Sequence, residues 1–211
     1  TRTGYRIVGR DPALYNPIGD NAMDFSKAIS AYGTTGASGS NSLAFGIGSK
    51  SGGDGSLAGG RRTEAQGRNS FAMGAETSAT SEQAVAIGCQ TTASNRQTFA
   101  SGTGSTASAR YSTAMGENTI ARSRSEFVVG MNNTDTAQAQ PDNFISSNQL
   151  FVVGNGENAF LKSDALVVYK SGNTTINGVL TLSDGSSSIT LPNTDGSSGQ
   201  VLATDGAGNV S

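Results

Sequence analysis

The stretch NSLAFGIGSKSGGD (residues 41–54) is followed at once by GSLAGGRRTEAQGR (55–68), and both place Ser-Leu-Ala-x-Gly at the same positions. Four further rows of fourteen residues continue the pattern without insertion or deletion: NSFAMGAETSATSE (69–82), QAVAIGCQTTASNR (83–96), QTFASGTGSTASAR (97–110) and YSTAMGENTIARSR (111–124). A seventh row opens with SEFVVG (125–130) and then breaks off. Self-similarity at a fixed period indicates a repeat architecture, in which every row folds into an equivalent unit.

We number the fourteen positions of a row as columns, starting from Asn41. Columns three and five hold mostly bulky apolar residues on either side of a small fourth column, and this period of two predicts a β-strand. The sixth column, always glycine, is expected to end that strand with a positive φ. The glycines are Gly46, Gly60, Gly74, Gly88, Gly102, Gly116 and Gly130, and the alanines of column four are Ala44, Ala58, Ala72, Ala86, Ala100 and Ala114.

A second, weaker strand is predicted at columns nine to eleven, for example at residues 77–79 and 91–93. Two short strands and two turns account for fourteen residues, so each row predicts one coil of an all-β solenoid with coils about 4.8 Å apart. Column nine holds only Ser or Thr in the six complete rows. We interpret it as an internal hydrogen-bonding ladder rather than as an ice-binding surface.

The size difference between the columns predicts which side chains face inward. We expect the alanines of columns four and eleven to fill a narrow interior, and the bulky residues of columns three and five to face outward, into an interface with sister chains. The opposite facing, with the bulky side inward, is the alternative. A lone fourteen-residue coil buries too few apolar side chains to offset the entropy lost on ordering it, so either facing predicts association.

Composition excludes several classes of function. Only 35% of the residues are hydrophobic, but the apolar columns keep their phase, which a disordered low-complexity chain does not do. A net charge of −2 does not favour nucleic acid as a partner. One cysteine, Cys89, and no histidine exclude an intramolecular disulfide and a zinc cluster. We expect no membrane insertion, no cofactor, no metal site, no catalytic residues and no enzymatic activity.

Column fourteen carries four arginines interrupted by Glu82, and they form the one candidate binding site in the sequence. Stacking three cations on adjacent coils is unfavourable unless an anion neutralises them. One interpretation is a ladder for acidic, sulfated or phosphorylated surface glycans. The other is pairing between subunits with nearby glutamates, or a solvated edge that deters sheet aggregation. The arginines are Arg68, Arg96, Arg110 and Arg124.

The segments NSLAFG, NSFAMG and QAVAIG, each followed by Ser or Thr three residues after the glycine, resemble the head repeats of trimeric autotransporter (YadA-like) adhesins. The resemblance covers residues 41–130. It implies a left-handed parallel β-roll, an intertwined homotrimer around one axis, and a role in adhesion.

The flanks resemble other proteins. TGYRIVGRDPALYNPIGDNAMDFS (3–26) is similar to segments that precede such rolls in phage tail-fibre-like and large surface proteins. NQLFVVGNG (148–156), SDALVVYKSGNTTING (163–178) and ITLPNTDGSSGQVLATDGAGNVS (189–211) resemble stalk segments of phage tail fibres and related bacterial proteins. We therefore expect an N-terminal cap or adaptor at 1–26, the β-roll at 27–130, a loop or side projection at 131–147, and a slender trimeric β stalk at 148–211.

These features together predict a trimeric fibre that attaches to a host or cell surface through a glycan or protein receptor. A phage tail fibre or an injection-particle fibre is favoured by the flanks, which places the chain on a virion tail or outside the cell. One alternative is a bacterial surface trimeric adhesin. The other is a purely structural shaft whose binding tip lies elsewhere.

Overall fold

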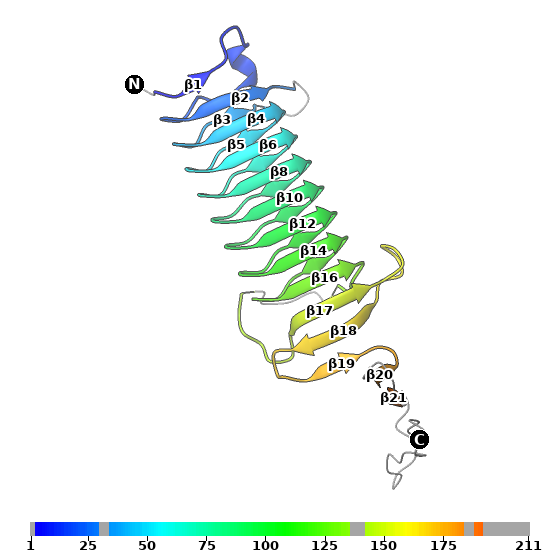
Figure 1. Ribbon diagram of the computed structural model, residues 1–211. Helices are drawn as coiled ribbons and strands as arrows, with labels where there is room; N and C mark the ends of the chain where they lie inside the picture. Colours follow the sequence, from blue (N-terminus) through cyan, green and yellow to red (C-terminus); the bar gives the residue numbers. More distant parts are fainter. Residues whose placement is uncertain (1–2, 30–33, 136–141, 184–187, 192–211) are drawn as a thin grey trace.

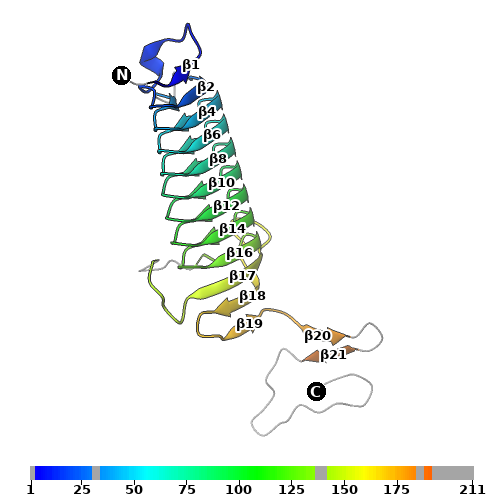
Figure 2. The ribbon, with the colours of Figure 1, turned by 60° about the vertical axis from the view of Figure 1, so that its left-hand side comes forward.

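The computed structural model describes residues 3–29, 34–135 and 142–183, and the backbone of 188–191. Within these residues the chain is all-β apart from one 3-10 turn, η1 (Pro12–Leu14). Its coils stack into a narrow column with β1 (Tyr5–Arg6) at one end and β19 (Thr174–Ile176) at the other (Figures 1 and 2). The expected all-β parallel solenoid with fourteen-residue coils is confirmed.

The long strand of each row spans columns three to seven and pairs in parallel with the same columns of the next row, as Val85 does with Phe99 and Gly88 with Gly102. Within the described residues these strands form the middle of a twelve-stranded sheet. They are β4 (Leu43–Ile47), β6 (Leu57–Arg61), β8 (Phe71–Ala75), β10 (Val85–Cys89), β12 (Phe99–Thr103), β14 (Thr113–Glu117) and β16 (Phe127–Met131).

The second strand of each row is shorter than expected, because it occupies columns ten and eleven only. In the described part of the chain these two-residue strands form a parallel seven-stranded sheet that closes the other side of the coil. They are β3 (Gly36–Ala37), β5 (Lys50–Ser51), β7 (Glu64–Ala65), β9 (Ser78–Ala79), β11 (Thr92–Ala93), β13 (Thr106–Ala107) and β15 (Ile120–Ala121).

The interior is filled by small side chains from both sheets. All six alanines of column four are fully buried, and so are the alanines of column eleven, such as Ala93 and Ala107. The bulky residues of columns three and five lie on the outer face of the long-strand sheet, where Phe71 and Val85 are half-buried and Ile87 is 38% exposed. The small-side-inward facing is therefore confirmed.

The glycine column has the expected positive φ, +124° at Gly88, but it does not end the strand, which continues through column seven. The reason for glycine is close stacking. A Cβ at Gly88 would lie 2.1 Å from the carbonyl oxygen of Gly102 on the next coil, a distance that no side chain tolerates. Each coil therefore rests on the backbone of its neighbour at this column.

The N-terminal boundary expected at residue 26 is wrong, because it cuts through a strand of the main sheet. β2 (Met23–Lys27) pairs in parallel with β4, and β1 pairs in parallel with β2. Asp24, fully buried on β2, accepts a 2.7 Å hydrogen bond from Arg6 Nε and two more from Ser26. The solenoid therefore begins before residue 27, and the Arg6–Asp24 ion pair links its first two strands, β1 and β2.

The C-terminal boundary differs in the same way. β17 (Gln149–Asn155) returns to the main sheet and pairs in parallel with β16, with Gly154 opposite Gly130. Residues 132–148 are therefore inserted between two neighbouring strands of the sheet, and part of the expected loop, residues 136–141, lies outside the described residues. Antiparallel pairing then adds β18 (Asp164–Tyr169) and β19, so residues 148–176 continue the sheet rather than forming a separate stalk.

Beyond β19 the chain forms a small antiparallel hairpin of β20 (Leu180–Ser183) and β21 (Ser188–Leu191). Figure 2 shows this hairpin projecting away from the column of coils. The remainder of the expected stalk, residues 192–211, lies outside the described residues.

Candidate functional site

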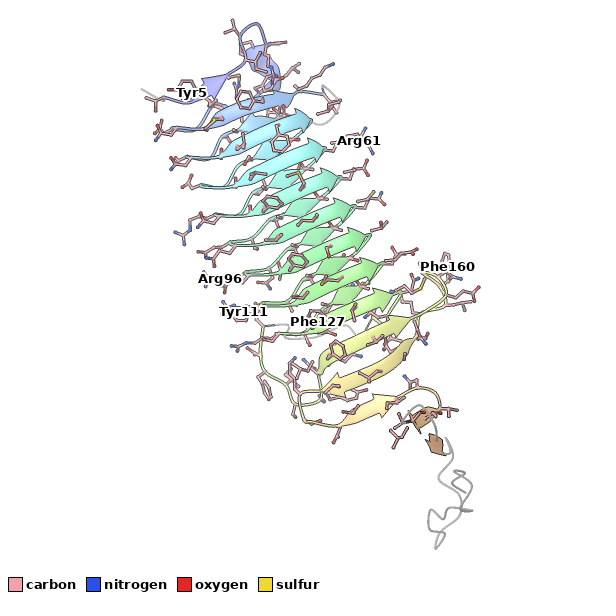
Figure 3. All side chains as sticks on the ribbon, viewed as in Figure 1. Tyr5, Arg61, Arg96, Tyr111, Phe127 and Phe160 are labelled. Carbon is pink, nitrogen blue, oxygen red and sulfur yellow. The ribbon has the colours of Figure 1, made fainter. Side chains whose placement is uncertain are left out.

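The column-fourteen side chains lie along one edge of the solenoid, at the turn that leads from the short strand to the next long strand. Figure 3 shows Arg96 and Tyr111 on this edge, with Arg61 and Phe160 on the opposite edge. Because adjacent coils are in strict fourteen-residue register, the four predicted arginines fall into one row. The structure therefore brings the predicted site residues together along a single edge.

The first half of this row is neutralised within the chain. Glu82 lies between Arg68 and Arg96, and one of its oxygens accepts from Arg68 while the other accepts from Arg96 Nη2 at 2.7 Å. The hydrogen bond from Arg68 is the main reason that the pKa of Glu82 is lowered, and the same bond raises the pKa of Arg68. The pairing is thus between coils of one chain.

The second half of the row has a different arrangement. Tyr111 lies next to both Arg110 and Arg124, whose guanidinium carbons are 5.8 and 5.7 Å from the ring centroid. These distances suit cation–π contact with the ring. Asp142 accepts from the backbone N–H of Arg110 at 3.0 Å. Among the described residues neither guanidinium forms a salt bridge, so these two cations are the ones left for an external anion.

A polar cluster lies where the row meets the last strands. Lys170 Nζ donates to Ser123 Oγ at 2.9 Å, and Ser123 Oγ donates to the carbonyl oxygen of Gln149 at 2.6 Å. Burial lowers the pKa of Lys170. The negative charge of Glu126 raises this pKa, and the positive charge of Arg124 lowers it further. These hydrogen bonds connect the end of β18 to the solenoid coil that contains Ser123.

Glu126 lies in the second column and is only 3% exposed. It accepts hydrogen bonds from the backbone N–H groups of Arg122 and Ser123, each at 2.7 Å. Burial raises its pKa, and these bonds oppose the rise. Column two as a whole faces inward, a feature that sequence reasoning missed because Ser, Thr, Ala and Glu share it without an apolar pattern.

The opposite edge also carries an ion-pair group that sequence reasoning did not single out. Arg62 Nη1 lies 2.9 Å from Glu76 Oε1, and Arg61 approaches the same oxygen at 3.5 Å. Two hydrogen bonds lower the pKa of Glu76: the one from Gln90 has the larger effect, and the one from Arg62 the next largest. The fourteen-residue spacing of Arg62, Glu76 and Gln90 could have predicted this contact, because residues of the same column stack on one another in adjacent coils.

The column-nine ladder is present only in part. Thr119 Oγ1 donates to Ser105 Oγ at 2.8 Å, and Ser105 Oγ donates to the carbonyl oxygen of Gly116. Among the described residues, the buried hydroxyls of Thr63, Thr77 and Thr91 have no hydrogen-bond partner. Their column is fully internal, so it provides no surface for a ligand.

Other site types are not formed by the residues that the structure describes. No group of three or more Cys, Asp or Glu side chains is placed to hold a metal ion among them. No helix in those ranges is long and apolar enough to cross a membrane.

Comparison with known proteins identifies the solenoid. No curated protein matches the chain. The family model described as the YadA head domain repeat (2 copies) matches residues 37–63, 65–88 and 93–119. These ranges run from β3 to the turn before β15 and lie within the fourteen-residue coils, which continue to β16. Residues 37–119 of the solenoid therefore contain YadA head domain repeats.

Proposed function

We propose that this chain is a segment of a homotrimeric attachment fibre of the adhesin type, displayed outside a cell or on a virion tail. The observation that carries the proposal is the apolar outer face of the long-strand sheet, which runs along a solenoid of YadA head domain repeats.

The outer face presents bulky side chains from consecutive coils. Phe25 is 50% exposed, Ile87 38% and Phe127 39%, and Phe127 stacks on Phe151 of the next coil with ring centroids 5.7 Å apart. Monomeric proteins rarely expose contiguous apolar patches larger than about a few hundred Å². A face of this kind supports burial against sister chains.

The shape of the face favours a closed assembly of identical chains. A flat apolar stripe that runs the length of a column is buried most completely when copies stand side by side around an axis parallel to the column. The YadA-like resemblance favours three copies. Weaker burial is expected where column five holds Gly59 or Ser101, although Phe45 fills the space above Gly59.

Attachment rather than catalysis is the function that an elongated, rigid column supports best. The flanking segments favour a phage tail fibre or an injection-particle fibre over a bacterial surface adhesin. A glycan or a protein on a target surface is the expected receptor.

The alternative is a structural shaft, and cell binding distinguishes the two. Fluorescently labelled trimer should bind a panel of bacterial or host cells saturably and compete with unlabelled protein. A trimer of the correct mass that binds no cell in such a panel would support the shaft and contradict attachment by this segment.

A further inference from the structure

The strongest unassigned feature is a hollow at the C-terminal end of the solenoid. Its volume is about 400 Å³, within the range of roughly 300–1,000 Å³ that small-molecule sites occupy. The lining residues come from the segment before β17, the end of β18, the following turn and β19: Ser146, Ser147, Tyr169, Ser171, Asn173 and Thr175.

The hollow has a physical origin in the two sheets. In the described residues the short-strand sheet stops at β15, whereas the long-strand sheet continues through β17, β18 and β19. Thr175 lies opposite Val167, which is buried in the core, so both are on the inner face of the sheet. Tyr169, two residues after Val167, is on this face too and packs against the core. The last strands therefore present an inner face that no strand of the described short-strand sheet covers.

The walls of the hollow are held by backbone hydrogen bonds. Ser171 N–H donates to the carbonyl oxygen of Ser146 at 2.8 Å, and Lys170 N–H donates to that of Asn148 at 2.9 Å. Tyr169 N–H donates to the carbonyl oxygen of Asn173 at 2.8 Å. The segment before β17 and the β18–β19 turn are thus tied together before any ligand arrives, which reduces the entropy lost on binding.

The side chains of the lining are polar and uncharged. Four carry aliphatic hydroxyls, Asn173 carries an amide, and Tyr169 carries a ring with a hydroxyl. Within the described residues only Ser171 Oγ takes part in a hydrogen bond, which it accepts from Asn173 N–H at 3.4 Å. The neighbouring cation, Lys170, points away to Ser123.

We infer that this hollow is a binding subsite for an uncharged saccharide, about one or two sugar rings in size; the inference rests on the proposed attachment function. Hydroxyls and an amide both donate and accept, as sugar hydroxyls do, and an aromatic ring offers a face to sugar C–H groups. An anionic ligand would need a cation or several free N–H donors, and no charged side chain is among the described residues that line the hollow.

The position of the subsite fits the proposed trimer. It lies on the inner face of the sheet, opposite the apolar stripe of columns three and five, so burial of that stripe leaves the hollow accessible. A homotrimer carries three copies. Several weak sites on one rigid body bind a surface of repeated sugars far more tightly than one site does.

The test is a glycan array probed with the full chain, carrying neutral oligosaccharides and sialylated or sulfated ones. The parent protein should bind a subset of the neutral glycans. The double variant Asn173→Ala, Thr175→Ala removes an amide and a hydroxyl that are both exposed, and it should lower the affinity for those glycans by about tenfold or more. The matched control Thr80→Ala, Ser94→Ala removes two exposed hydroxyls from the short-strand side and should change nothing.

The other outcomes overturn the inference in distinguishable ways. Unchanged neutral-glycan binding by Asn173→Ala, Thr175→Ala, with the parent melting temperature, places the sugar site elsewhere. Binding of acidic glycans alone, lost on Arg110→Gln, Arg124→Gln, replaces the hollow with the arginine row. If the parent protein binds cells but no glycan on the array, the saccharide subsite is contradicted and the attachment function is not. If it binds neither cells nor glycans, both proposals are contradicted.

Discussion

Ala86 has no room for a larger side chain. It is fully buried, and the residues stacked above and below it, Ala72 and Ala100, are fully buried too. Replacing Ala86 with Leu should lower stability by about 1–3 kcal/mol per chain, because overpacking forces strained rotamers and backbone shifts. A thermal melt measures the effect. The same change at Ala75, on the partly exposed edge at column seven, should leave the melting temperature nearly unchanged. Equal melts for the two variants would contradict a narrow interior.

Gly88 permits two separate effects to be measured. Its φ is +124°, and a Cβ there would lie 2.1 Å from the carbonyl oxygen of Gly102. Gly9 also has a positive φ, +85°, but a Cβ there meets nothing within 4 Å. Gly9→Ala should therefore cost only the roughly 1–2 kcal/mol of a left-handed L-residue. Gly88→Ala should cost clearly more, as seen in denaturant unfolding. Similar losses would show that φ, and not coil stacking, selects glycine.

Glu126 should make stability fall as pH rises. Burial raises its pKa above the ordinary value of 4.5, so the folded protein holds this proton more tightly than the unfolded chain does. The stabilisation is complete below pH 4.5 and is lost as pH increases through the raised pKa. Glu126→Gln removes this titration. The melting temperature of the variant should therefore rise relative to that of the parent as pH increases above 4.5. A difference between the melting temperatures of variant and parent that stays constant with pH would contradict the burial argument.

Single positions also show what the sequence leaves open. The alternation around Ala86 is enough to place it inside, because bulky neighbours cannot share a narrow interior. The positive φ at columns one and eight is harder to predict from the sequence. Tyr111, Glu76 and Arg62 adopt it there, as Asn and Gly do at the equivalent positions of other coils. Those conformations are imposed by the stacking of each turn on the next. They are a property of the assembled coil and not of local preference.

The arginine row behaves as an element with two halves. Arg68 and Arg96 share Glu82, so Arg68→Gln, Arg96→Gln should lower the melting temperature by itself, and only slightly, because solvent screens exposed ion pairs. Arg110→Gln, Arg124→Gln should lower stability less, because these cations neutralise no carboxylate among the described residues. Melting with and without heparin measures both variants. Any stabilisation of the parent by heparin should require Arg110 and Arg124, should weaken with salt, and should persist in Arg68→Gln, Arg96→Gln. The reverse dependence would contradict this division.

At the level of strands, the sequence predicts the regular coils and misses their continuation. Residues 127–130 and 151–154 both read FVVG, and the structure pairs them residue for residue. A fixed period of fourteen does not detect this match, because the excursion between the strands makes that coil longer. The binding hollow was beyond sequence reasoning for a related reason. It depends on where the short-strand sheet stops relative to the long-strand sheet, which no single row encodes.

In the whole molecule, we expect three chains to bury the apolar stripe of columns three and five against one another. The stripe is continuous from β2 to β17 because the coils stay in register. A single column buries mainly alanine and hydroxyl side chains inside, so its stability should depend on this outer burial. Folding and assembly should therefore occur together, with no folded monomer at equilibrium.

Size-exclusion chromatography with multi-angle light scattering, on the natively folded chain, measures this most directly. We expect a single species of three times the chain mass of 21.3 kDa, which persists on dilution until the β-sheet circular dichroism signal is lost. A folded, cooperatively melting species at 21.3 kDa would contradict it.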